Sequence, residues 1–155
     1  MAKGMYKPLN PSKYLGNPTK IRFLSAWELR VMEFFDKNPA ILQWGSEEIK
    51  IPYYNPVKKA AATYIPDFIV KYKDSSGNIQ TEVIEVKPSK EATIRKKMSN
   101  YDKVMLVINT AKWQACGAMC AKANIKFRVL TEAGSMLIGA DGKASQITTD
   151  GLFRK

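Results

Sequence analysis

The sequence contains no histidine. This absence excludes histidine-based catalytic triads, zinc hydrolases with histidine ligands, and nucleases that use a histidine general base. The chain has only two cysteines, Cys116 and Cys120, too few ligands for a zinc site. Their spacing of four places both on one face of a helix, and we expect both to be buried core residues. Catalysis would therefore have to use carboxylates, lysine, a metal ion, or hydroxyl and thiol nucleophiles.

Long apolar runs are also missing. No apolar stretch of the sequence approaches the roughly 20 residues that a membrane-spanning helix needs. Residues 1–20 lack the apolar centre of a secretory signal, so we expect a cytosolic protein. A chain of 155 residues that is 45% hydrophobic and 25% charged suits one domain with a real core.

Acidic residues are scarce compared with basic ones. The chain has 14 acidic and 25 basic residues, which gives a net charge of +11. Such a charge attracts polyanions, and nucleic acid is the first candidate. An anionic membrane is a weaker candidate because no long basic amphipathic helix stands out. The charge alone also fits a basic protein that is merely soluble, so it needs a second signal.

The composition divides the chain into three parts. Residues 1–20 hold three prolines and four lysines, which predicts an extended basic arm. This arm either follows a phosphate backbone or a protein partner, or it is a solvated tail. Residues 21–133 form the predicted domain, and residues 134–155, rich in Gly, Ser and Thr, form a predicted peripheral C-terminal segment.

Hydrophobic periodicity predicts an α/β domain with a mixed sheet. Ser25 followed by Glu28 is a capping box, and it starts a predicted helix over residues 25–37. Trp113 to Ala123 reads as a helix with Thr110 as its N-cap. Residues 104–108 fit either a helix or a strand. We expect strands at 47–53, 63–72 and 80–87 in an antiparallel meander, a basic loop at 55–61, and a fourth strand at 125–130.

Three charged residues interrupt the apolar strands of this meander. Glu85 and Lys87 are two residues apart, so their side chains share one face of the strand. The turn at residues 75–77 fits a three-residue type I turn with a bulge, in which Gly77 takes the left-handed conformation. That turn pairs position 74 with position 78, and the register carried along the ladder places Asp67 directly opposite Glu85.

Two carboxylates this close repel each other unless a cation lies between them. Oxygen ligands favour Mg²⁺ or Mn²⁺ over Zn²⁺, and Lys87 could orient or deprotonate a water or stabilise charge on a phosphorane. The alternative is a cross-strand salt bridge among Asp67, Glu85 and Lys87 on a solvated face. The apolar neighbours of these residues and the net positive charge favour the metal site.

The words "IPDF" and "IEVKP" resemble the PD-(D/E)XK nuclease signature, with Asp67 and Glu85 separated by 18 residues. The resemblance implies a restriction-endonuclease-like core in which Asp67, Glu85 and the backbone carbonyl of Val86 hold Mg²⁺ and Lys87 orients the water. Many members supply a further acidic residue from the preceding helix, and Glu28 matches it, binding the metal directly or through water. This role competes with the capping role of Glu28.

The resemblance extends to words outside the site, including "FLSAWELRVMEFFDKNPAILQWGSEEIKIPYYNP", "INTAKWQACGAMCAKANIKFRVLTE" and "KYLGNPTKI". They are similar to head-completion nucleases of T-even-like tailed phages over residues 7–133. This implies a Mg²⁺-dependent DNA endonuclease, with Mn²⁺ as a substitute and no nucleotide cofactor. It also implies portal and neck proteins as partners, and a location in the host cytoplasm during assembly or in the head–neck region of the virion.

Basic residues outside the signature are expected to hold the phosphates of double-stranded DNA, including its ends or branches: Lys58, Lys59, Lys90, Arg95, Lys96 and Lys97. Two alternatives stay open, a structural plug that binds DNA without cutting it and an endonuclease of transposase or resolvase type. Trp44 and Trp113 either stack on bases or belong to the core, and we expect the core. Glu47 either approaches the site or does not.

Overall fold

The structure is a computed structural model that describes residues 3–92 and 94–147. Its centre is a six-stranded sheet in the order β10-β9-β8-β7-β6-β3. Strands β7 and β8 pair in parallel, and the other four neighbouring pairs are antiparallel, which confirms a mixed sheet. The strands are β3 (Ile41–Ser46), β6 (Phe68–Lys73), β7 (Ile79–Val86), β8 (Lys126–Thr131), β9 (Gly134–Ile138) and β10 (Ala144–Ile147).

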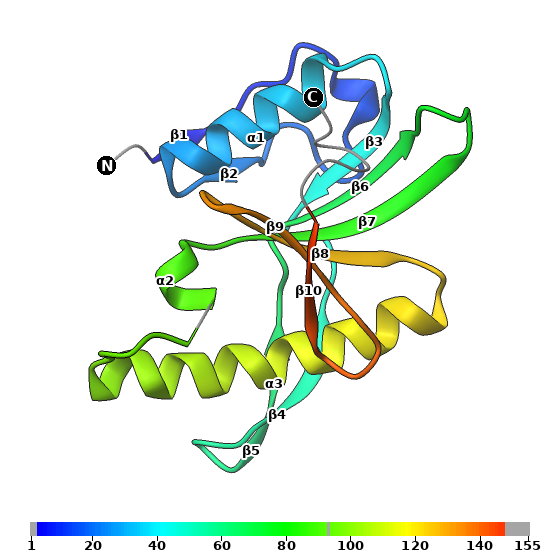
Figure 1. Cartoon of the computed structure of the whole chain (residues 1–155). Helices are drawn as coiled ribbons and strands as arrows, with labels where there is room; N and C mark the ends of the chain where they lie inside the picture. Colours follow the sequence, from blue (N-terminus) through cyan, green and yellow to red (C-terminus); the bar gives the residue numbers. More distant parts are fainter. Residues whose placement is uncertain (1–2, 93, 148–155) are drawn as a thin grey trace.

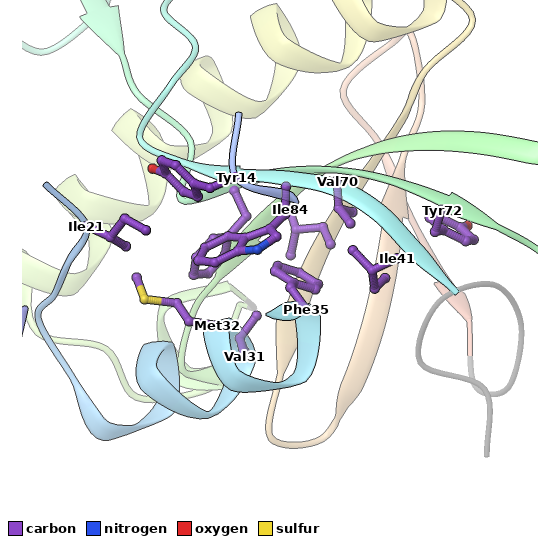
Figure 2. Close-up of a cluster of buried hydrophobic side chains, with 11 residues drawn as sticks. Tyr14, Ile21, Val31, Met32, Phe35, Ile41, Val70, Tyr72 and Ile84 are labelled. Atoms are coloured by element: carbon purple, nitrogen blue, oxygen red, sulfur yellow. The ribbon is translucent and has the colours of Figure 1, made fainter. Parts of the chain in front are cut away.

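Two helices lie on opposite sides of this sheet, with α1 above it and α3 below it in Figure 1. The α1 helix (Ala26–Lys37) starts where Ser25 Oγ accepts a hydrogen bond from the Glu28 N–H at 3.1 Å. Its buried residues Met32 and Phe35 pack against Ile84 of the sheet in the first of two hydrophobic cores, shown in Figure 2. The predicted helix and its cap are therefore confirmed.

The N-terminal segment belongs to this first core. Strand β1 (Gly4–Met5) pairs with β2 (Arg22–Phe23), and a short 3-10 helix, η1 (Pro11–Lys13), lies between them. Tyr14 is 6% exposed and meets the ring of Trp44 edge-on, with the ring centres 4.8 Å apart. The prediction of an extended arm is wrong for this part of the chain, because aromatic packing outweighs the proline-rich, basic composition.

The α3 helix (Asn100–Lys122) is one continuous helix of 23 residues, so residues 104–108 are helical. Its N-cap is Ser99, whose Oγ accepts the Asp102 N–H at 3.0 Å. The prediction of Thr110 as N-cap is wrong, because Thr110 lies inside the helix and its hydroxyl donates to the Leu106 carbonyl at 2.7 Å. Among the described helices, which include the short α2 (Ser89–Ala92), none combines the length and apolar character of a membrane span.

The inner face of α3 forms the second core. Trp113, Cys116 and Cys120 pack there against Val83 and Phe127 of the sheet. Both cysteines are buried and free, which confirms their predicted place in the core.

Two predicted strands are wrong in their boundaries. In place of a strand at 47–53, the chain forms β3, turns at Glu47 with a positive φ of 57°, and resumes as β4 (Ile51–Asn55). The predicted strand at 63–72 breaks at residues 65–67 into β5 (Ala60–Tyr64) and β6, because Pro66 has no N–H to give to a ladder. Strands β4 and β5 form a separate hairpin that extends past α3 in Figure 1, and the predicted loop at 55–61 is its turn.

The prediction of a peripheral C-terminal segment is also wrong as far as residue 147. Strands β9 and β10 extend the main sheet beyond β8, and Ile138 is 6% exposed in the second core. Ser135 is buried and its hydroxyl accepts a 2.7 Å hydrogen bond from Arg128. Residues 148–155 of the predicted segment lie outside the described residues, as do residues 1 and 2 of the predicted arm.

Candidate active site

The turn between β6 and β7 sets the register of the site. The Asp74 N–H donates to the Asn78 carbonyl at 2.8 Å, and Gly77 has a φ of 83°. The ladder pairs Phe68 with Ile84, as this turn predicts. Asp67, one residue before β6, therefore faces Glu85 on β7. The predicted register is confirmed.

Backbone hydrogen bonds tie the two carboxylates together. The Asp67 N–H donates to Glu85 Oε1 at 3.3 Å, and the Val86 N–H donates to Asp67 Oδ2 at 2.8 Å. Glu85 is 6% exposed, and Asp67 is half-buried behind the buried Pro66. Pro66 ends the ladder here, so the Val86 N–H is free to bind the Asp67 side chain instead of a strand partner.

The electrostatics of the pair follow from this geometry. Burial and the neighbouring Glu85 carboxylate raise the pKa of Asp67 to about 8, against the opposing effects of the Val86 N–H and Lys87. Burial also raises the pKa of Glu85, while the Lys87 charge, the Tyr64 hydroxyl and the Asp67 N–H oppose this rise. At neutral pH the pair therefore keeps a proton unless a cation compensates its charge.

Lys87 lies beside the pair, with Nζ 3.5 Å from Glu85 Oε2. The side chain of Glu85 is 8% exposed and that of Lys87 is 24% exposed. Of the alternative salt bridge among Asp67, Glu85 and Lys87, the Glu85–Lys87 pair thus exists, but it does not cross between strands and does not lie on a solvated face. Water and salt screen a partly buried ion pair less than an exposed one, so the Lys87 charge acts more strongly on groups near it.

Glu28 contacts the N-terminus of its own helix, and its charge acts on Asp67 in the site. Its Oε1 accepts the Leu24 N–H at 3.2 Å, which is a capping contact. The charge of Glu28 also contributes to the raised pKa of Asp67, after the effects of burial and Glu85. The carboxylate is therefore close enough to act on Asp67 while it caps the helix, and its role at a metal stays a prediction.

The oxygen atoms of the site fit a hard dication. The Lys87 N–H points to β8, where it donates to the Leu130 carbonyl at 3.0 Å. Because successive residues of a strand point their backbone groups to opposite sides, the Val86 carbonyl points to the Asp67 side. Asp67, Glu85 and this carbonyl are the oxygen donors that Mg²⁺ and Mn²⁺ prefer. In residues 3–92 and 94–147, however, no three carboxylate or thiol side chains gather as a metal site by themselves.

Two residues that the sequence did not single out also lie at this site. Tyr64, at the end of β5, is 4% exposed, and the Glu85 charge adds to the burial that raises the pKa of its hydroxyl. Lys112 of α3 places Nζ 5.6 Å from the centre of the Tyr64 ring. No local pattern reveals them, because their place depends on how α3 packs under the sheet.

The predicted DNA-contacting residues form two groups. Lys58 and Lys59 are exposed in the β4–β5 turn, which Asn55 holds by accepting the Val57 and Lys58 N–H groups through Oδ1. Lys90 lies in α2, and Arg95, Lys96 and Lys97 lie between α2 and α3. Arg95 pairs with Asp102 at 2.9 Å, so the Asp102 carboxylate compensates part of the Arg95 charge.

The remaining candidate residues take structural positions. Trp44 and Trp113 are 1% and 5% exposed, which confirms that both belong to the core. Glu47 approaches the site through its backbone, since its N–H donates to the Asp67 carbonyl at 3.0 Å. The Glu47 carboxylate lies 3.5 Å from Arg22.

Comparison with known proteins agrees with this geometry. Residues 38–132 match the family model described as "TnsA-like endonuclease N terminal", a range that includes both carboxylates and Lys87. The chain therefore belongs to the TnsA-like endonuclease family. It is also 40% identical over 149 residues to the head completion nuclease of Enterobacteria phage T4, covering 90% of this chain and 97% of that protein. No solved structure matches the chain significantly.

Proposed function

We propose that this protein is a Mg²⁺-dependent DNA endonuclease of PD-(D/E)XK type that acts in the completion of phage heads. The observation that carries the proposal is the Asp67–Glu85 pair, which is buried, raised in pKa and locked by the 2.8 Å bond from Val86 to Asp67. Family membership and 40% identity to a nuclease support the same reading.

In this proposal Asp67, Glu85 and the Val86 carbonyl would hold Mg²⁺, with Mn²⁺ as a substitute, and Glu28 would bind the ion directly or through a water. A bound Mg²⁺ would polarise the phosphate and lower the pKa of a coordinated water. Lys87 orients the attacking water and stabilises the negative charge that grows on the phosphoryl oxygens. The water oxygen bonds to phosphorus while the bond to one ester oxygen breaks. That oxygen leaves with the electron pair and takes a proton, giving an alcohol and a phosphate monoester.

Duplex DNA is the proposed substrate, and basic residues on both sides of the site would hold its phosphates: Lys58, Lys59, Lys90, Arg95, Lys96 and Lys97. The similarity to the head completion nuclease of phage T4 supports a place in head completion. Action at the portal or neck of the filled capsid, contact with portal and neck proteins, and work in the host cytoplasm or at the head–neck region of the virion belong to this proposal.

The proposal is tested by nicking of supercoiled plasmid with Mg²⁺ or Mn²⁺, using the wild type, Asp67→Ala and Glu85→Ala. We expect each variant to lose at least ~100-fold in rate, since each loses a group that acts on the transition state. Wild-type cleavage no faster than that of Asp67→Ala on supercoiled, linear and branched DNA would overturn the catalytic role.

The same samples separate an enzyme from a plug that only holds DNA. Calorimetry with Mn²⁺ should show one site in the wild type that Glu85→Ala weakens or removes. DNA binding without any such metal site would support the plug. Cleavage confined to branched DNA would instead support a resolvase-type enzyme.

A further inference from the structure

Helix α3 brings a lysine to the same face of the sheet as Glu85. Val83 of β7 packs in the second core with Trp113 and Tyr64. Glu85 is two residues further along the strand, so its side chain points to the same α3 side. Lys112 precedes Trp113 on the helix, and its charge reaches both Glu85 and Lys87. The site thus has one lysine on its α3 side, Lys112, that lies outside the PD-(D/E)XK signature.

The Lys112 ammonium forms no salt bridge in the part of the chain that the structure describes, although the Glu85 charge acts on it. Lys112 makes a cation–π contact with Tyr64, with Nζ 5.6 Å from the ring centre. The side chain is half-buried, and burial followed by the nearby Lys87 lowers the pKa of Lys112, while Glu85 opposes the shift. A strongly hydrated ammonium gives up water at a cost when it is covered. A half-buried lysine without a paired carboxylate is therefore suited to bind an anion that arrives from outside.

The Tyr64 hydroxyl adds a second donor at the same place. Tyr64 is 4% exposed, and its buried hydroxyl forms no well-aligned hydrogen bond among the described residues, although the Glu85 carboxylate lies close enough to accept one. A buried hydroxyl left unpaired costs roughly 1–3 kcal/mol, and native proteins rarely retain one without a reason. Because Lys112 lies over the same ring, the hydroxyl is placed to donate either to Glu85 or to an acceptor oxygen that a ligand supplies.

We propose that Lys112 Nζ and the Tyr64 hydroxyl form a phosphate subsite on the α3 side of the Asp67–Glu85 pair. This subsite binds a non-bridging oxygen of the DNA phosphate that is cleaved. The proposal rests on the proposed endonuclease function and extends it. It divides the work at the phosphate between Lys87, from the strand signature, and Lys112, from the helix.

The first test compares Lys112→Met with Lys122→Met, which removes an exposed lysine in the last turn of the same helix. Affinity for a short duplex is measured against salt concentration in EDTA, so this readout needs neither metal nor cleavage. We expect Lys112→Met to lower the salt slope by about 1, the value for one lost phosphate contact, and to do so more than Lys122→Met. Equal slopes for the two variants would overturn the subsite.

The second test measures cleavage and metal binding. We expect Lys112→Met to reduce kcat by ~100-fold and Lys112→Arg to recover at least ~10-fold of it, because the lost donor acts in the transition state. Mn²⁺ affinity should stay within ~2-fold of the wild type in both variants. A lower salt slope with an unchanged kcat would overturn placement at the cleaved bond.

Tyr64→Phe keeps the ring under Lys112 and removes only the hydroxyl. We expect kcat to fall ~10-fold with a nearly unchanged thermal midpoint, since the hydroxyl makes no well-aligned hydrogen bond in the free protein. An unchanged kcat would overturn the part of Tyr64. A wild type that never nicks would overturn the proposed function, while the salt slopes still decide the subsite.

Discussion

The Val86 N–H and the Asp67 carboxylate meet at 2.8 Å although 19 residues separate them in the chain. The bond forms at the point where Pro66 ends the pairing of β6 with β7. A backbone donor of the central strand thus holds a site carboxylate in one rotamer. This is the rigid positioning that the proposed metal site would need.

The raised pKa of Asp67 should be visible as a pH dependence of stability. A carboxyl whose pKa rises from 3.8 to about 8 on folding holds its proton more tightly in the folded state. Stability is therefore fully present below the unfolded pKa and is lost as pH rises through the folded pKa. In EDTA we expect Asp67→Asn to be more stable than the wild type by roughly 1–2 kcal/mol at pH 8 and similar to it at pH 4.

Urea denaturation across this range makes the measurement, with Asp141→Asn as the control because Asp141 is exposed in the β9–β10 turn. If Asp67→Asn and the wild type show parallel profiles between pH 4 and 8, Asp67 does not carry the raised pKa.

The two contacts of Glu28 predict different outcomes for two substitutions. Ser25→Ala removes the N-cap acceptor of the Glu28 N–H, so we expect a loss of about 1 kcal/mol and little change in kcat. Glu28→Gln keeps an acceptor for the Leu24 N–H but removes the charge that reaches Asp67. We expect it to lower kcat at least ~10-fold with a stability change under ~1 kcal/mol. Wild-type kcat in Glu28→Gln would leave Glu28 with the capping role alone.

The exposed lysines of the β4–β5 turn should act on DNA affinity more than on chemistry. We expect Lys58→Ala/Lys59→Ala to reduce the salt slope of DNA binding by about 2 and to leave kcat at saturating DNA nearly unchanged. The control is Lys71→Ala/Lys73→Ala, which removes two exposed lysines of β6 on the way to the β6–β7 turn. Matching slopes in the two double variants would exclude the hairpin from the DNA interface.

Gly77 carries the register of the site through one dihedral angle. An added Cβ at Gly77 would meet nothing within 4 Å, so only the φ of 83° opposes a side chain there. We expect Gly77→Ala to cost about 1 kcal/mol in urea denaturation. Gly77→Asn should cost less, because Asn tolerates the left-handed region better. Equal losses would show that the turn has another constraint.

Asp36 anchors the N-terminal segment to α1. It accepts hydrogen bonds from the Tyr6 hydroxyl at 2.6 Å, the Leu9 N–H at 2.7 Å and the Asn10 N–H at 3.0 Å. Burial alone would raise the pKa of Asp36, but these bonds outweigh it and the pKa is lowered. The stability that Asp36 contributes is therefore present above its unfolded pKa and is lost as pH falls through the folded pKa.

We expect Asp36→Asn to cost about 2–3 kcal/mol at pH 7, and less in acid, because it removes the charge that strengthens three hydrogen bonds. Tyr6→Phe removes one bond and should cost about 1 kcal/mol. Thermal or urea unfolding at pH 7 and pH 3.5 checks both. A loss for Asp36→Asn that does not change with pH would contradict the lowered pKa.

Local signals predicted the features that depend on near neighbours. Ser25 and Glu28 marked the start of α1, and Gly77 marked the turn that aligns Asp67 with Glu85. These predictions succeeded because capping and turn geometry depend on a few adjacent residues. The predicted N-cap at Thr110 failed for the opposite reason. A threonine inside a long helix can satisfy its hydroxyl on the preceding turn, and only the packing of the whole helix shows this.

The errors in the two terminal segments share one physical cause. Tyr14 and strands β9 and β10 lie in segments whose composition is basic, proline-rich or glycine-rich, and long-range contacts decide their structure. The expected strand at 47–53 has wrong boundaries because Glu47 turns the chain after β3 with a positive φ, and no residue pattern near Glu47 predicts this turn. Composition describes local preference, whereas burial depends on what else is available to cover a surface.

The sequence by itself determined the carboxylate pair, its lysine and the turn that brings them together, because hairpin register depends on local spacing. It also determined the kinship with TnsA-like endonucleases. Only the tertiary structure decided that Lys112 and Tyr64 join this site and that Glu28, while it caps its helix, lies close enough to act on Asp67. Those outcomes depend on how α1 and α3 pack against the two faces of one sheet. No local pattern predicts which helix residues will lie beside the site after this packing.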